Sequence, residues 1–399
     1  MRLRLLGWSI VCLAMVMGAG AGVASASGVI QGHGTPPSGR LGPPRFTALP
    51  LKEVSPTALK AQIAASSTVK TWSSSITSGL GGTFTYRMIG KSPLVKQSNP
   101  VTNVTADVIP VKLTFKDSGV SFDPTKADPG CLNGSGSADS LLLNSSIFGK
   151  HAYTVSGKNL GTVQYLDGFQ REEFAKYILN SGAVNPGYHV NLSPVNNEPK
   201  VSVSVDSSAG VTGSGACGGA DVGVLDISAW DNFLQTTLLP SLSSEIKPTQ
   251  FPVFLFYNVV LENGGNCCII GYHSGFQASN GVQTYATTDY VSKGLFAGPL
   301  TDIYAASHEV GEWINDPFVN NDTPAWGHVG QVSGCQSNLE VGDPLSGKPS
   351  VNVKMPNGVT YHNQELAFRD WFYRTKSVGL NGWFSSRGTF KSNAGPACS

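Results

Sequence analysis

The sequence His308-Glu309-Val310-Gly311-Glu312 places metal-binding residue types at the spacing of one helical turn. In an α-helix, side chains at positions i and i+4 lie on one face, with Cβ atoms about 5–6 Å apart. His308 and Glu312 could therefore bind one metal ion from the same side. Glu309 would then lie beside the ion, where a carboxylate can act as general base on a water molecule.

The flanking residues predict that this motif lies on a helix within 299–317. Thr301 is the expected N-cap residue, and Pro317 ends the pattern. Apolar residues recur at helical spacing, which indicates that at least half of the helix is buried. They are Ile303, Ala306, Val310, Trp313 and Ile314. A carboxylate on such a helix needs a hydrogen-bond partner, a counter-charge or a metal ion.

A third ligand is expected from further along the chain. Glu340 follows in the segment NLEVGDP, with Asp343 three residues later. Asp316, just after the helix, would orient His308 or Glu312 through a hydrogen bond, or else hold the end of the helix. Asp343 has the same two alternatives: it could orient a ligand or hold its own turn.

Three other histidines could replace Glu340 as the third ligand. They are His273, His328 and His362. A histidine in a loop is more often simply exposed. We favour His328 among the three, because its loop connects the helix to the segment of Glu340.

From residue 299 to residue 344, the order of these residues resembles a group of exported bacterial proteins that look like relatives of zincin-type metallopeptidases. The pattern is A-S-H-E-x-x-E-x-x-x-D-P, followed by a Trp-Gly pair and by E-V-G-D. The resemblance implies a zincin-like catalytic domain with a mixed sheet and an active-site helix. It implies His308, Glu312 and Glu340 as metal ligands and Glu309 as general base, with zinc as the favoured divalent ion.

The motif departs from the zincin pattern H-E-x-x-H, because Glu312 replaces the second histidine. A second carboxylate neutralises a divalent ion and weakens its Lewis acidity, so water would be less completely activated. Oxygen ligands also admit Mn²⁺, Fe²⁺ or Ca²⁺. Beside a plain disulfide-braced surface protein with no metal, two functions therefore stay open. One is peptide hydrolysis, in which Glu309 deprotonates a metal-bound water. The other is a non-catalytic secreted binding or cell-surface protein with a structural metal site.

The first 26 residues have the features of a cleavable signal peptide. Arg2 and Arg4 precede an apolar run over residues 5–17, and the sequence A-S-A at 24–26 forms a cleavage site. We therefore expect cleavage after Ala26, a secreted protein in an extracellular or periplasmic space, and no membrane span in the mature chain.

The cysteines agree with export. Cys12 lies in the expected signal peptide, and the six that remain could form three disulfides in an oxidising compartment. Cys267 and Cys268 are adjacent, and we expect them to pair with different partners. The C-x₂-C spacing of a zinc knuckle is absent.

Composition indicates the class of partner and the division of the chain into segments. The charged fraction is 13% and the formal net charge is +1, which argues against a nucleic-acid partner. Residues 27–80 are rich in Pro, Gly and Ser, and we interpret them as a leader or pro-like segment. Residues 81–399 are predicted to form one disulfide-braced α+β domain. Its elements include a strand over 163–168 and one buried strand over 252–261. We expect a monomer that acts on a peptide or protein substrate.

Overall fold

The computed structural model describes residues 25–32, 34–51, 54–195, 200–217, 219–393 and 398. The expected signal peptide lies outside these residues except for its last two positions, Ser25 and Ala26, which begin a strand. The described chain is α+β, with a mixed sheet, few helices and disulfides. Among the residues that the structure describes, no helix is long and apolar enough to span a membrane.

The central element is a mixed sheet of twelve strands. Its strands are β1 (Ser25–Ile30), β2 (Arg45–Ala48), β5 (Val101–Phe115), β6 (Ser121–Phe122), β9 (His189–Pro194), β10 (Lys200–Val205), β11 (Gly210–Ala216), β12 (Ala220–Asp226), β13 (Phe251–Tyr257), β14 (Val259–Asn263), β15 (Asn266–Ala278) and β16 (Gly281–Tyr290). The main path runs β1-β10-β5-β13-β16-β15-β14-β12-β11. Beside it, β2 pairs with β15, and β6 and β9 pair with β5.

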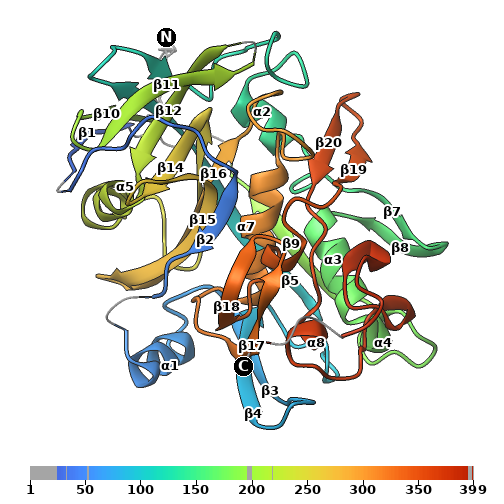
Figure 1. Ribbon diagram of the computed structural model, residues 1–399. Helices are drawn as coiled ribbons and strands as arrows, with labels where there is room; N and C mark the ends of the chain where they lie inside the picture. The colour runs from blue at the N-terminus through green and yellow to red at the C-terminus, as the bar shows by residue number, and fades with distance from the viewer. Residues whose placement is uncertain are drawn as a thin grey trace, which may run out of the picture.

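Hairpins and helices surround this sheet (Figure 1). The two-stranded hairpins are β3 (Thr71–Thr77) with β4 (Thr83–Ile89), β7 (His151–Val155) with β8 (Lys158–Val163), β17 (Asp322–Val329) with β18 (Val332–Asn338), and β19 (Val351–Lys354) with β20 (Thr360–Asn363). The helices are α1 (Pro56–Ala64), α2 (Ala138–Leu143), α3 (Tyr165–Glu173), α4 (Ala175–Ile178), α5 (Ile227–Phe233), α6 (Leu239–Ser241), α7 (Tyr304–Asn315) and α8 (Arg369–Phe372). The remaining helical segments are the π-helix η1 (Leu234–Leu238) and the 3-10 turns η2 (Asp343–Leu345), η3 (Leu380–Gly382) and η4 (Ser386–Gly388).

Helix α7 packs on β15 and β16 and is buried along its whole length. Trp313 stacks on Phe251 of the sheet with ring centroids 3.6 Å apart, and its Nε1 donates to Thr284 Oγ1 at 3.0 Å. On another side of the helix, Leu366 lies so close to Gly311 that a Cβ there would be 2.4 Å from it. Any polar side chain on α7 is therefore shielded from water.

The predicted helix within 299–317 is confirmed, but its predicted N-cap is wrong. The helix begins at Tyr304, and Ile303 occupies the N-cap position. Thr301 instead directs its hydroxyl towards the carbonyl of Val291, at 3.5 Å. The isolated bridge between Val291 and Asp302 keeps the preceding residues extended, so the helix begins later.

Two strand predictions also need correction. The run 252–261 is not one strand, because Asn258 adopts φ +54° and separates β13 from β14. The segment 163–168 is not a strand, because β8 ends at Val163 and α3 begins at Tyr165. Helix α3 buries Leu166 and Phe169 in the main core, which a helical turn places on one side.

The pro-like segment 27–80 contributes several strands. β1 pairs in parallel with β10, β2 pairs in parallel with β15, and β3 pairs with β4. In Figure 1, β2 passes beside β15 near α7. Whether this segment is removed from the mature protein stays a prediction.

The six described cysteines form three disulfides: Cys131–Cys217, Cys267–Cys268 and Cys335–Cys398. The expectation that Cys267 and Cys268 pair with different partners is wrong. The two residues are bonded to each other, with their Cα atoms 3.1 Å apart and the peptide bond between them cis.

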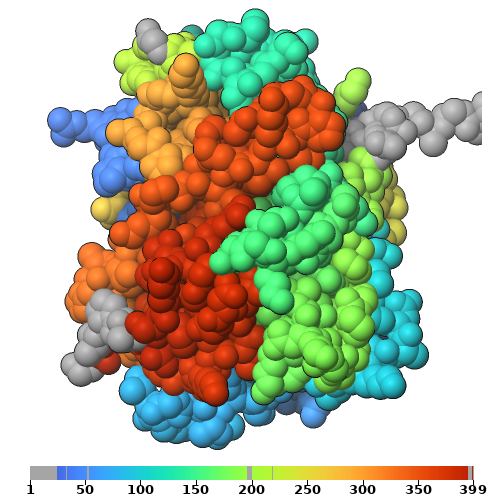
Figure 2. Space-filling model, turned by 90° about the vertical axis from the view of Figure 1, so that its right-hand side faces the viewer, coloured from blue at the N-terminus to red at the C-terminus, as the bar shows by residue number. Residues whose placement is uncertain are grey.

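The C-terminal segment closes one face of the molecule. It lies beside α3 and α4, and these segments appear in red and green in Figure 2. The backbone N–H of Arg369 donates to Glu173 Oε1 at 2.8 Å, and that of Lys176 donates to the carbonyl of Val378 at 2.9 Å. The polar contacts therefore tie the end of the chain to α3 and α4, and α3 in turn contacts α7.

Candidate metal centre

Two imidazoles and four carboxylates meet where α7 crosses the sheet. Helix α7 contributes three of them, β15 contributes one, and the segment from the end of β18 to η2 contributes two. The six residues are His273, His308, Glu309, Glu312, Glu340 and Asp343. All six are buried, and none is more than 6% exposed. The predicted cluster of His308, Glu309 and Glu312 with the downstream acidic segment is thus brought together in space.

The imidazole of His308 has a defined tautomer. Its Nδ1 lies 2.8 Å from Gln364 Oε1, and Gln364 Nε2 donates to the carbonyl of Gly342. Because a carbonyl can only accept, the Gln364 amide has one orientation, and His308 Nδ1 must carry the proton. His308 Nε2 is therefore a bare nitrogen. It is buried without a hydrogen-bond partner, 3.0 Å from Glu312 Oε2 and 3.6 Å from Asp343 Oδ1.

Amide groups hold the carboxylates in place. Glu312 Oε1 accepts from the backbone N–H of Gly342 at 3.0 Å. Asp343 accepts from Gln331 Nε2 and, at 3.0 Å, from Gln336 Nε2. Such outer hydrogen bonds fix the direction of ligand atoms in metal sites.

Gly342 lets this segment approach the helix closely. A Cβ atom at this position would lie 2.4 Å from His308 Nδ1. Its φ is −85°, so the glycine is required by the close approach to the ring and not by an unusual backbone conformation.

His273 has a defined tautomer as well. Its Nε2 lies 3.2 Å from the carbonyl oxygen of Asp316, which can only accept, so Nε2 carries the proton. Its Nδ1 is then bare and lies 3.2 Å from Glu309 Oε2 and 3.7 Å from Glu312 Oε2. Both histidines therefore direct a lone pair towards carboxylates.

Burial dominates the electrostatics of the centre. It raises the pKa of Glu309, Glu312 and Glu340 well above their usual range, and their mutual repulsion raises the pKa values further. Burial also raises the pKa of Asp343 to about 6 and lowers that of His308 to about 4. In the described part of the chain, the lysine and arginine ion pairs do not reach these carboxylates. Protons or metal cations must therefore neutralise them.

Glu340 was predicted as a ligand and Asp343 as an orienting residue. The two lie on the same side of the centre, but their carboxylates contact different residues. Asp343 joins His308 and Glu312 in a set whose ligand atoms all lie within 4.8 Å of one another. Glu340 lies next to Glu312, and its Oε1 accepts from Asn338 Nδ2 at 2.9 Å. The geometry therefore favours Asp343 as the third ligand.

The other predicted residues lie elsewhere or act differently. The Asp316 carboxylate accepts from the backbone N–H groups of Asn320 and Asn321, both at 3.0 Å, and so holds the loop after α7. Its contact with the centre is the carbonyl bonded to His273. His362 lies 2.6 Å from Asp302, outside the cluster.

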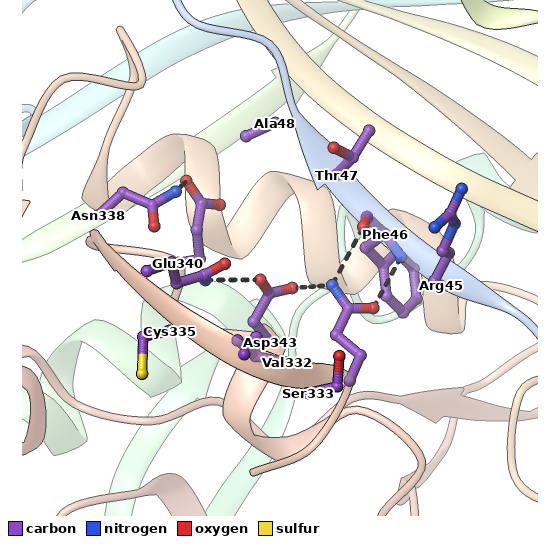
Figure 3. Close-up of a pocket in the computed structure, with 13 residues that line it drawn as sticks. Arg45, Phe46, Thr47, Ala48, Val332, Ser333, Cys335, Asn338, Glu340 and Asp343 are labelled. Carbon is purple, nitrogen blue, oxygen red and sulfur yellow. Dashed lines mark hydrogen bonds between the residues drawn. The ribbon is translucent and has the colours of Figure 1, made fainter. Parts of the chain in front are cut away.

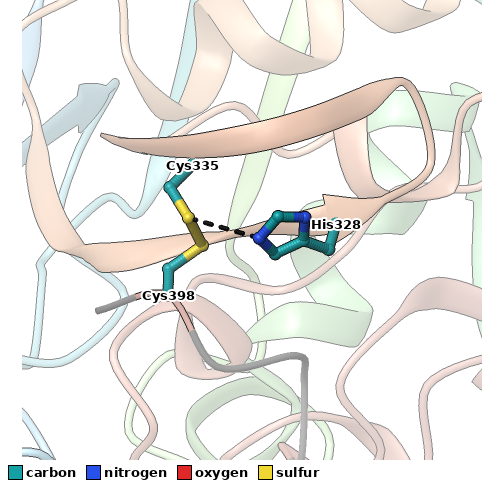
Figure 4. Close-up of side chains that lie close together, drawn as sticks. All are labelled: His328, Cys335 and Cys398. Atoms are coloured by element: carbon teal, nitrogen blue, oxygen red, sulfur yellow. Dashed lines mark hydrogen bonds between the residues drawn. A yellow bond between two sulfur atoms is a disulfide. The ribbon is translucent and has the colours of Figure 1, made fainter.

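His328, the favoured alternative ligand, is exposed beside a disulfide (Figure 4). Its Nε2 lies 3.6 Å from Sγ of Cys335, which is bonded to Cys398. These three residues lie close enough together to hold an ion. The thiolate is the metal ligand, however, so the oxidised pair leaves His328 without sulfur co-ligands.

A polar pocket of about 350 Å³ leads to the centre between β2 and β18. Figure 3 shows Glu340 and Asp343 between these strands, with Phe46 on the side of β2. The Phe46 ring stacks on the His308 ring, with centroids 3.6 Å apart. The pocket thus reaches the outer carboxylates, while Phe46 covers the histidine.

Sequence reasoning placed His273 below His328 as a ligand, because the loop of His328 connects the motif helix to the segment of Glu340. The signal that could have identified it is a titratable residue, His273, within the largely apolar segment IIGYHSG.

No protein-family model, curated protein or solved structure matches the chain. The geometry of the centre is therefore the main guide to function.

Proposed function

We propose that the protein is an exported, metal-dependent peptidase whose ion is bound by His308, Glu312 and Asp343. The bare, buried Nε2 of His308 carries this proposal, because it faces two carboxylates without a hydrogen-bond partner. Ligand atoms about 2.0–2.1 Å from one ion lie about 2.9–3.4 Å apart at octahedral to tetrahedral angles. The separations of 3.0 and 3.6 Å are close to that range.

A bound divalent ion, with zinc favoured by the motif, would supply Lewis acidity that polarises a carbonyl and makes water more acidic. Glu309 is the proposed general base. Its Oε2 lies 3.2 Å from His273 Nδ1, whereas its Oε1 has no hydrogen-bond partner. Oε1 is therefore the oxygen of Glu309 that is free to accept a proton.

Strand β2 supports a peptide as the class of substrate. It is an extended segment beside the centre, parallel to β15. The Gln331 side chain accepts from Phe46 N at 2.8 Å and donates to Phe46 O at 3.1 Å. These contacts recognise main-chain groups, which every peptide offers in extended form.

The cover over the centre fits the interpretation of 27–80 as a pro-like segment. His308 and Glu309 are fully buried, and Phe46 lies on the His308 ring. In this proposal, β2 leaves the edge of β15 before a substrate binds. Export is supported by the disulfides, which persist in oxidising compartments.

Metal analysis tests the proposal. The content of the purified protein is measured by mass spectrometry beside that of His308→Ala and of His328→Ala, a matched control in which an exposed histidine is removed. We expect His308→Ala to lose at least one equivalent and His328→Ala to lose none. Absence of metal from the wild-type protein after incubation with Zn²⁺ or Mn²⁺ would exclude a metallopeptidase.

Glu309→Gln then tests catalysis. The variant should keep the ion bound by His308 and lose about 10²- to 10⁴-fold of hydrolysis of a labelled protein substrate, because the amide cannot accept the proton. Loss of the His308 ion in this variant would contradict the role of base.

A structural metal site in a non-catalytic secreted protein is the second candidate. The complete burial of the centre favours it, since structural sites are closed. If the Phe46→Ala variant, with its metal bound, hydrolyses no peptide in a mixed peptide library, the structural role is supported.

A further inference from the structure

We infer that the centre binds a second divalent cation through His273, Glu309 and Glu312, so that Glu312 bridges two ions. This inference rests on the proposed function for its first ion. The ligand atoms of these three residues lie within 4.8 Å of one another, as do those of His308, Glu312 and Asp343. Each set has one histidine, and Glu312 belongs to both.

The orientation of His273 shows that its Nδ1 is available as a ligand. The Asp316 carbonyl fixes the proton on Nε2, so the Nδ1 lone pair faces Glu309 Oε2 at 3.2 Å. A lone pair and a carboxylate oxygen at this distance repel each other unless a proton or a cation lies between them. This is the same arrangement as that of His308 Nε2 with Glu312.

Glu312 is placed to bridge the two ions. Its Oε1 is occupied by the N–H of Gly342, and its Oε2 faces both imidazoles, 3.0 Å from His308 Nε2 and 3.7 Å from His273 Nδ1. Two-metal sites hold their ions about 3.5–4 Å apart, which a shared carboxylate oxygen allows.

The charge of the cluster supports two ions. Glu309, Glu312, Glu340 and Asp343 carry four negative charges when ionised, and all are buried. One divalent ion leaves two of these charges uncompensated, whereas two divalent ions balance all four. A buried charge without compensation is strongly unfavourable.

His273 supplies the observation beyond the acidic cluster, because its fully buried Nδ1 carries no proton and faces Glu309 and Glu312. Glu309 is fully buried, yet its Oε1 has no hydrogen-bond partner. Glu309 can bind the second ion through Oε2 and keep Oε1 for a proton. The donor set of two imidazoles and four carboxylates matches di-iron and di-manganese carboxylate centres, so Mn²⁺ and Fe²⁺ join Zn²⁺ as candidate ions.

The experiment counts the ions. The apo-protein is loaded with excess Mn²⁺ and desalted, and its metal content is measured beside that of His273→Gln, His308→Ala and His328→Ala. We expect two equivalents in the wild type and in His328→Ala, and one equivalent in each of the other variants. His273→Gln preserves side-chain size and an amide donor for the Asp316 carbonyl, and thermal unfolding checks that it is folded.

Electron paramagnetic resonance of the Mn²⁺-loaded wild type gives a second readout that needs no variant. Two ions that share Glu312 should give an exchange-coupled spectrum, whereas separate ions give the spectrum of isolated Mn²⁺. A content of one equivalent that His308→Ala removes and His273→Gln keeps would overturn the second site and leave the first intact. No bound metal in the wild type would overturn both. Two uncoupled ions would overturn the bridge.

Discussion

The phenyl ring of Phe46 lies flat on the imidazole of His308, with ring centroids 3.6 Å apart and planes inclined by 13°. The two residues are far apart in sequence, and the pairing of β2 with β15 brings them together. Phe46 belongs to the segment that we interpret as pro-like, and His308 is the first residue of the metal motif. The cover and the centre are thus in direct contact.

Replacing Phe46 with alanine should open the centre. An aromatic pair is worth about 0.5–1.5 kcal/mol beyond its buried area, so we expect a chelator to remove the bound metal roughly tenfold faster or more. The rate is measured by stopped-flow absorbance with a coloured chelator.

Phe122→Ala is the matched control for this measurement. Phe122 is a buried phenylalanine in the core around β5 and β10, which is separate from the two clusters that contain α7 and Phe46. Both variants should lose about 3–5 kcal/mol of stability. If both release metal at the same rate, Phe46 acts through general stability and does not gate the centre.

The motif on α7 could be predicted from sequence because it depends on local spacing. A helix places His308 and Glu312 on one face wherever it packs, and its apolar residues predicted the burial. The acidic segment at Glu340 and Asp343 could be named as a source of ligands. That Asp343 would lie beside His308 could not be predicted, because the path of the chain after β18 decides it. In the structure, Gln331 and Gln336 donate to the Asp343 carboxylate.

His273 and Phe46 could not be assigned from sequence. Each lies on a strand, and strand pairing over long separations decides what it meets. The α+β fold class could be predicted from sequence, as α7 could, because short alternating strands and a few amphipathic helices produce local sequence patterns. The interruption between β13 and β14 at Asn258 could not be predicted, because the residues on both sides of Asn258 form one apolar run.

Gln364→Leu should weaken metal binding without unfolding the protein. Gln364 accepts from His308 Nδ1 and so keeps Nε2 bare for the ion. Loss of such an outer partner costs about 10- to 100-fold in metal affinity, which competition with a chelator of known affinity would measure. Gln283→Leu is the control, because that buried amide donates to the carbonyls of Gln250 and Thr284. Equal affinities in the two variants would contradict the orienting role.

Glu173, on the helix α3 that contacts α7, should make stability depend on pH. Its carboxylate is buried in α3 and accepts from Arg369 N at 2.8 Å and from Gln170 Nε2 at 3.0 Å. Burial raises the pKa of Glu173 to about 8, whereas a glutamate in the unfolded chain has a pKa of about 4.3. Between these values the folded protein keeps a proton that the unfolded chain has released.

The free energy of unfolding should therefore fall as the pH rises through this interval, by up to about 1.4 kcal/mol per pH unit from this group. Glu173→Gln is neutral at every pH, so its stability should fall less steeply between about pH 5 and about pH 8. Urea unfolding followed by tryptophan fluorescence measures the slopes. Glu245→Gln, at an exposed position, is the control and should keep the wild-type slope. If the free energy of unfolding of Glu173→Gln has the same pH dependence as that of the wild type, the Glu173 carboxylate is already ionised in the folded protein. The packing of α3 against the C-terminal segment would then not keep this carboxyl group protonated.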